Sequence, residues 1–73
     1  MKLSNLKTGS KAKIQKILAN KDVKVKLTSL GINPNTEIMM IKNDQKGGVI
    51  LAISQNRIIL GRDLADKIEV EQL

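Results

Sequence analysis

The alternation of hydrophobic and polar residues predicts short β-strands over most of the chain. Residues 11–14 alternate polar and apolar, which is the period of a half-buried strand. Ile14 and Ile17 then lie three positions apart, and a β-bulge between them would return both to the core. Four further strands are predicted at Glu37–Ile41, Val49–Ser54, Arg57–Leu60 and Lys67–Glu71.

Residues 23–30 fit two kinds of structure. Val23, Val25 and Leu27 alternate as in a strand, whereas Val23, Leu27 and Leu30 are spaced as on one face of a helix. The flanking residues favour a helix of two turns, because they include candidate signals for both of its ends. The candidates for the helix N-cap are Asn20 and Asp22.

The predicted end of this helix is a glycine motif. Gly31 follows the last periodic residue and is expected to adopt a left-handed conformation, and Pro34 blocks continuation. In that frame Leu27 and Ile32 form the hydrophobic contact of a Schellman end.

Turn residues separate the remaining elements. Residues 43–48 form a polar turn that closes a hairpin, and Gln55-Asn56 is predicted as a tight turn. Residues 61–66 are predicted to form one helical turn, and residues 1–10 form a lead-in with Leu3 and Leu6 as apolar anchors. Short strands at this spacing predict a mainly β fold, a small closed β-barrel with one short helix after the first strand and a one-turn helix before the last.

Composition restricts the chemistry available to the chain. Its 73 residues are enough for one domain, residues 1–73, and they include no Cys, His, Phe, Trp or Tyr. Disulfides, thiol nucleophiles, imidazole bases and His- or Cys-ligated metals are therefore excluded. The longest apolar run, Val49–Ile53, is too short to span a membrane, and no secretory signal is visible. We expect a soluble cytoplasmic domain.

Positive charge is concentrated in the amino-terminal part. Residues 1–26 carry eight lysines and one acid, Asp22. The net charge of the whole chain is +6. This asymmetry indicates nucleic acid, an anionic membrane surface or an acidic protein as partner, and the alternative is a solvated face that maintains solubility. Barrels that bind single strands stack bases on aromatic side chains, which this chain lacks, so nucleic acid is a less favoured partner.

No constellation indicates catalysis or a cofactor. Asp63 and Asp66 could share a helix face, but no partner for acid–base work is recognisable, so the chain is not expected to be an enzyme. Gly47-Gly48 lies in a hairpin and lacks the lysine of a phosphate-binding loop. The acids are scattered, so no metal site and no small-molecule substrate are predicted.

An ordered set of motifs from about Leu3 to Val70 resembles the FeoA family, ferrous-iron transport protein A. The most specific piece is Leu27–Asn35 (LTSLGINPN). It is similar to the family motif Leu-x-x-Leu-Gly-Ile-x-Pro-Gly, in which x is any residue. A second matching piece is Ile58–Val70 (IILGRDLADKIEV).

Two positions depart from the family's pattern. Asn35 stands where glycine is usual, and asparagine also accepts left-handed geometry. Val49 stands where proline is frequent after the double glycine. The residues that carry the structural part of the resemblance are Gly31, Pro34, Gly47, Gly48 and Gly61.

The resemblance implies an SH3-like barrel and a function in ferrous-iron uptake. Family members are thought to act with FeoB, a membrane permease with a cytosolic GTPase domain, so we expect a cytoplasmic accessory protein that contacts this permease and is at most peripheral at the membrane. The same domain occurs at the carboxyl end of some metal-dependent repressors. The alternative function is a basic SH3-like module that binds nucleic acid or serves in regulation.

A partner-binding face is expected on the strand at residues 37–41. The family pattern directs Ile38 and Met40 inward, which turns Met39 and Ile41 outward as an apolar strip. Methionine suits an adaptable binding surface, and the basic helix could steer an acidic partner toward the strip. The helix residues expected to do so are Lys24 and Lys26. The alternative is that the lead-in covers Met39 and Ile41 through Leu3 or Leu6.

Overall fold

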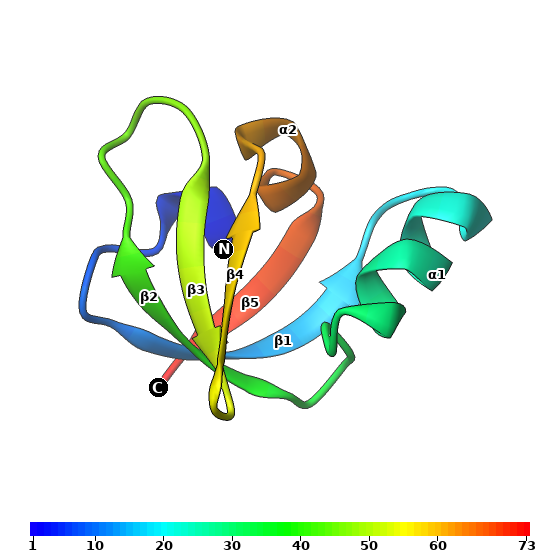
Figure 1. The fold of residues 1–73 in the computed structure, drawn as a ribbon, viewed down its shortest axis with the longest axis horizontal. Coiled ribbons are helices and arrows are strands. Elements are labelled where there is room, and N and C mark those ends of the chain that lie inside the picture. The colour runs from blue at the N-terminus through cyan, green and yellow to red at the C-terminus, as the bar shows by residue number, and fades with distance from the viewer.

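The computed structural model describes all residues from 1 to 73 as one strongly curved five-stranded sheet with two short helices (Figure 1). The strands are β1 (Lys11–Ile17), β2 (Glu37–Lys42), β3 (Val49–Ile53), β4 (Asn56–Leu60) and β5 (Ile68–Gln72). The helices are α1 (Lys21–Ser29), α2 (Arg62–Ala65) and a 3₁₀ turn, η1 (Leu3–Asn5). The predicted mainly β fold, with a helix after the first strand and a helical turn before the last, is confirmed.

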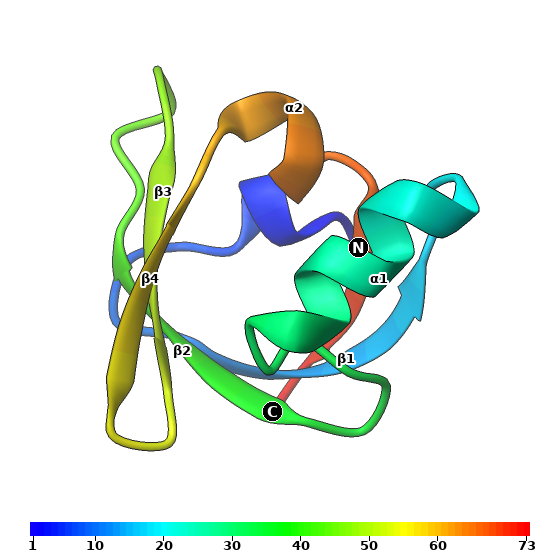
Figure 2. The ribbon, with the colours of Figure 1, turned by 45° about the vertical axis from the view of Figure 1, so that its right-hand side comes forward.

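All strand pairs are antiparallel, in the order β4-β3-β2-β1-β5. The sheet curls until its two ends face one another across the core, as the two views of Figures 1 and 2 show. The predicted closure of the barrel is wrong, because no ladder joins β4 to β5 and both remain edge strands.

The bulge predicted in β1 is present. The pairing between β1 and β5 shifts register between Ile14 and Lys16, so Ile14 and Ile17 are both buried although they lie three residues apart. A second irregularity in β2, between Met40 and Lys42, leaves Ile41 without a paired residue on β3. Bulges of this kind increase local twist and bend a strand, which a small barrel needs at its corners.

Helix α1 begins and ends with recognisable caps. Its N-cap is Asn20, whose side-chain oxygen accepts a hydrogen bond from the Val23 amide at 2.9 Å. At the other end Gly31 has a φ of +91°, and the Ile32 amide donates to the Leu27 carbonyl at 3.0 Å. These are the features of the predicted Schellman end.

The core consists of sixteen buried residues, all aliphatic or methionine. Leu3 and Leu6 of the lead-in are completely buried in it, so this segment fills the barrel from within. Helix α1 contributes only Leu27 to the core, with Val23 partly buried beside it. Leu30, expected on the same face, is 43% exposed because the helix has already ended there.

Several predicted boundaries were wrong by one or two residues. The tight turn consists of Ser54 and Gln55, not Gln55 and Asn56, because Ser54 adopts a φ of +56° and Asn56 already pairs with Ile53. The start of α1 at Lys21, in contrast, agrees with Asn20, one of the two predicted N-caps. Strand β5 is shifted by one residue, since its first buried side chain is that of Ile68.

Candidate docking face

Met39 and Ile41 lie on the side of β2 that faces away from the core. Ile38 and Met40 are buried, whereas Met39 and Ile41 are half-buried and stand outside the core cluster. The lead-in leucines are buried on the inner side of the sheet, so they do not cover Met39 and Ile41 as the alternative required. Alternation along the pleat produces this arrangement.

Neighbouring strands continue the apolar surface. Met39 pairs with Ala52 on β3, and Ile50 on the same side of β3 pairs with Ile59 on β4. Ile50 and Ala52 are half-buried, and Ile59 is 75% exposed. We call the surface formed by Met39, Ile41, Ile50, Ala52 and Ile59 the outer apolar face.

An open depression with a volume of about 260 Å³ lies at one end of this face. Ala52 and Ser54 line it, and their small side chains leave space beside the longer Met39. Its wall carries both signs of charge, from Lys11 of β1 and Glu37 of β2. The depression can therefore accept an aliphatic side chain, while its own rim provides polar groups.

The two lysines expected to flank the apolar strip lie elsewhere. Lys24 and Lys26 are exposed on α1, on either side of Val25, which is 60% exposed. Figures 1 and 2 both place α1 on the opposite side of the barrel from the β2–β3 hairpin. The cations in register with Met39 and Ala52 are instead Lys11 and Arg57.

Two of the eight amino-terminal lysines are in register with acidic residues on neighbouring strands. Lys13 of β1 lies opposite Glu37 on one side and Glu71 on the other, and Lys16 lies opposite Glu69. The sheet thus places lysines of β1 opposite glutamates from distant parts of the chain. The charge asymmetry seen along the sequence is reduced on this surface, and no continuous basic stripe follows β1.

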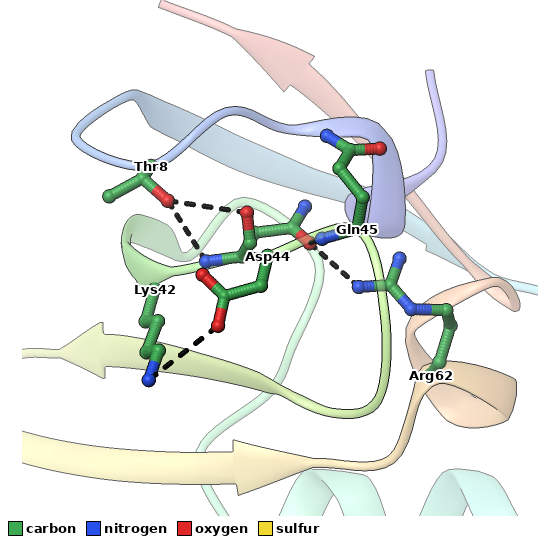
Figure 3. Close-up of polar contacts among 6 residues, drawn as sticks. Thr8, Lys42, Asp44, Gln45 and Arg62 are labelled. Atoms are coloured by element: carbon green, nitrogen blue, oxygen red, sulfur yellow. Dashed lines mark hydrogen bonds and ion pairs between the residues drawn. The ribbon is translucent and has the colours of Figure 1, made fainter.

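The polar cluster around Asn43 holds segments of the chain together. The buried Asn43 donates from Nδ2 to the carbonyls of Ser4 and Leu6, at 2.8 and 2.9 Å. Its Oδ1 accepts from the Gln45 amide and from Nη2 of Arg62. Figure 3 shows Arg62 reaching from α2 toward this turn. Every buried side-chain polar atom has a partner, so no buried side chain in the cluster is left unpaired.

The motif residues of the resemblance occupy turns. Pro34 and Asn35 are the central residues of a type II turn, with Asn35 at a φ of 72° and the Thr36 amide donating to the Asn33 carbonyl. Gly47 has a φ of 69°. A side chain on Gly48 would come within 2.7 Å of the Leu60 carbonyl oxygen. Gly61 has an ordinary φ of −62° and open space around it.

The structure shows no cluster of three or more Asp, Glu, Cys or His side chains that could hold a metal ion. No helix is both long and apolar enough to cross a bilayer.

Residue-by-residue interpretation of the sequence missed part of the docking face. Ile50, Ala52 and Ile59 were assigned to strands, but nothing local in the sequence says that they adjoin Met39. The alternation in β3 is the signal that could have found them, since Val49, Leu51 and Ile53 are buried and Ile50 and Ala52 face outward.

Comparison with known proteins agrees with the motifs. Residues 1–72 match the model of the FeoA domain. A protein of Methanocaldococcus jannaschii named "Putative Fe(2+) transport protein A" is 38% identical over 69 residues, covering 94% of this chain and 83% of that protein.

Solved structures show the same fold. The crystal structure of an iron uptake regulatory protein, FeoA, has a TM-score of 0.94 and 27% identity, covering 100% of this chain and 97% of that one. A zinc complex of FeoA from Stenotrophomonas maltophilia, described as a prokaryotic SH3 domain protein, has a TM-score of 0.84 and 21% identity, covering 97% and 89% of the two chains. The fold is SH3-like, and the chain belongs to the FeoA family.

Proposed function

We propose that this chain is a cytoplasmic accessory protein of ferrous-iron uptake, which acts by contact with the cytosolic part of a FeoB-type membrane permease. The observation that carries the proposal is the match to the FeoA domain over residues 1–72, together with the 38% identical protein named for Fe(2+) transport. The protein acts by binding and not by catalysis.

The outer apolar face supports a role in protein–protein contact. Its side chains come from three adjacent strands, and Lys11 and Arg57 flank it. An apolar centre with a charged rim is typical of surfaces that bind other proteins. The depression beside Met39 provides a place for one anchoring side chain of the permease.

The alternative function, a basic module that binds nucleic acid, has less support. It rests on the lysine-rich amino-terminal part, and in the folded chain Lys13 and Lys16 lie opposite glutamates. A titration with random DNA over a salt series would test it, because binding to phosphates weakens steeply as salt rises. We expect no binding to DNA at physiological salt.

The proposal is tested by measuring binding of the chain to the whole permease in lipid nanodiscs. The wild-type chain is compared with the double variant Met39→Ser/Ile41→Thr. Because the two side chains are half-buried at the surface, the double variant should remain folded and bind at least about tenfold more weakly.

Val25→Ser is the matched control, since it removes an exposed aliphatic side chain from α1, away from the outer apolar face. It should bind within about twofold of the wild type. Absence of wild-type binding at about 100 μM, an affinity near −5.5 kcal/mol, would contradict the proposed function. An equal loss in Val25→Ser and the double variant would contradict the outer apolar face as the contact.

A further inference from the structure

Strand β4 presents an open hydrogen-bonding edge. It lies at the end of the sheet and pairs only with β3. The two-residue turn at Ser54 and Gln55 makes Ile53 and Asn56 a hydrogen-bonded pair, and such pairs alternate along an antiparallel ladder. The backbone groups of Arg57 and Ile59 therefore point away from β3, toward the free edge.

No hydrogen bond elsewhere in the chain uses these groups. The backbone bonds outside the regular elements include none to Arg57 or Ile59, and no side chain bonds to either. Ile59 is 75% exposed, so the edge is accessible to another molecule.

The opposite edge of the sheet is already covered. Met1 donates to and accepts from Val70 of β5, at 3.0 and 2.8 Å, and Lys2 forms an isolated bridge with Glu69. Proteins usually protect edge strands by such coverage, by bulges or by proline. β4 has none of these, because its register with β3 is regular and it contains no proline.

Charge indicates the kind of segment that fits this edge. From Lys46 to Arg62 the β3–β4 hairpin and its flanks carry three cations and no acid, and Arg57 takes part in no ion pair. A second copy of the chain is the less suitable occupant, since each copy carries a net charge of +6. An acidic segment is complementary to this edge.

We propose that β4 binds an extended acidic segment of a partner protein, which adds to the sheet as an antiparallel strand. Pairing to the open groups of Arg57 and Ile59 places two segment residues beside these side chains, on the outer side of the sheet. Because the strands run in opposite directions, the residue beside Ile59 comes first. The segment should therefore read apolar, any residue, acidic.

This binding site shares Ile59 with the outer apolar face, but none of its residues lines the depression beside Met39, and it does not depend on the permease as the partner. The two proposals fail independently, because peptide binding at β4 and permease binding by the outer apolar face are measured with different ligands.

The test is an NMR titration of the whole chain with the capped peptide Thr-Glu-Thr-Val-Thr-Glu-Thr, in which valine and the second glutamate carry the pattern. We expect amide shifts centred on residues 56–60 and saturation below about 2 mM. A peptide with an N-methylated valine has the same side chains, but its valine cannot donate to the Ile59 carbonyl, so it should bind at least about fivefold more weakly.

Charge reversal provides a second arm. Arg57→Glu should bind the acidic peptide at least about fivefold more weakly than the wild type does. The variant should instead bind a peptide with lysine in place of both glutamates. Lys24→Glu on α1 makes the same charge change far from β4 and should leave the preference for the acidic peptide in place. The double variant Met39→Ser/Ile41→Thr should also retain peptide binding.

Three results would overturn the proposal. They are a lack of shifts in β4 at about 2 mM peptide, equal binding of the N-methylated peptide, and failure of Arg57→Glu to change the charge preference. Concentration-dependent dimerisation through β4 without peptide would assign the edge to a second copy and would overturn the proposed occupant.

Discussion

Arg62 donates from Nη2 to the side-chain oxygen of Asn43 at 2.7 Å, and this bond joins the start of α2 to the turn after β2. The same asparagine also holds the backbone of Ser4 and Leu6. Arg62 in turn donates from Nε to the Gly47 carbonyl at 2.8 Å. One buried amide therefore connects the lead-in, the hairpin turn and α2, three segments that have no sheet ladder in common.

Replacement of Asn43 should destabilise the fold more than a surface change. Asn43→Ala removes four hydrogen bonds. It leaves the Leu6 carbonyl without its side-chain donor and the Ser4 carbonyl with only Nη1 of Arg62, at 3.3 Å. We expect a loss of about 2–4 kcal/mol in the free energy of unfolding, measured by urea denaturation followed by circular dichroism. Asp44→Ala is the control, because Asp44 makes only an exposed ion pair with Lys42, and it should change stability by less than about 0.5 kcal/mol.

Gly31→Val should damage folding. At a φ of +91° a β-branched residue is strained by about 1–2 kcal/mol or more, although the nearest atom to an added Cβ, on Ile53, is 3.9 Å away. Gly31→Asn should be less destabilising, because asparagine tolerates left-handed geometry. Thermal unfolding measures both, and equal stability of the valine and asparagine variants would show that strain is not the cause.

Gly48 and Gly61 should respond in opposite ways to a side chain. Gly48→Ala forces a methyl group toward the Leu60 carbonyl, so we expect a loss of about 1–3 kcal/mol. Gly61 is the N-cap of α2 and has free space, so Gly61→Ser can cap the helix and should not lower stability. Destabilisation by Gly61→Ser in urea titrations would contradict this assignment.

Adjacent methionines on β2 should differ in their importance for stability. Met40 is completely buried, so Met40→Ser should cost about 2–5 kcal/mol, while Met39→Ser on the outer face should cost less than about 1 kcal/mol. Chemical denaturation of the two variants compares them directly. A loss of more than about 2 kcal/mol in Met39→Ser would mean that Met39 belongs to the core.

We also expect that the chain alone does not bind ferrous iron tightly. Its only anionic ligands are carboxylates, with no imidazole or thiolate. Anaerobic calorimetric titration with Fe²⁺ should show nothing tighter than about 100 μM, near −5.5 kcal/mol. A stoichiometric micromolar site would contradict this prediction.

Local patterns in the sequence were sufficient for several elements. The three-residue spacing of Ile14 and Ile17 indicated the bulge, and the residues around Gly31 indicated the Schellman end, because both are determined by neighbouring residues. The start of α1 was predicted only as a choice between the N-caps Asn20 and Asp22, since the polar residues Lys21 and Asp22 give no hydrophobic period that would decide between them. The turn at Ser54 was missed because serine rarely adopts a left-handed conformation.

The candidate surfaces depended on contacts between distant residues. Alternation in β2 left two sets of residues that could face inward, and the resemblance to the family chose the one that turns Met39 outward, as the structure has it. The neighbours of Met39 are set by pairing with β3 and β1. The position of Lys24 on another side of the barrel follows from how Leu27 anchors α1 to the core. The open edge of β4 follows from the strand order, which local sequence patterns do not contain.

The pairing of β1 with β5 has a consequence for how the domain is made. β1 is the first strand of the chain, and it lies between β2 and β5, the last strand. Ile14 therefore pairs with Val70, which is far away in the sequence. During synthesis β1 can pair with β2 early, but its other side stays open until residues 68–72 have left the ribosome. Closing so long a loop slows folding toward the millisecond-to-second range of β-barrels. Until then, the chain exposes the unpaired edge of β1 to other nascent proteins.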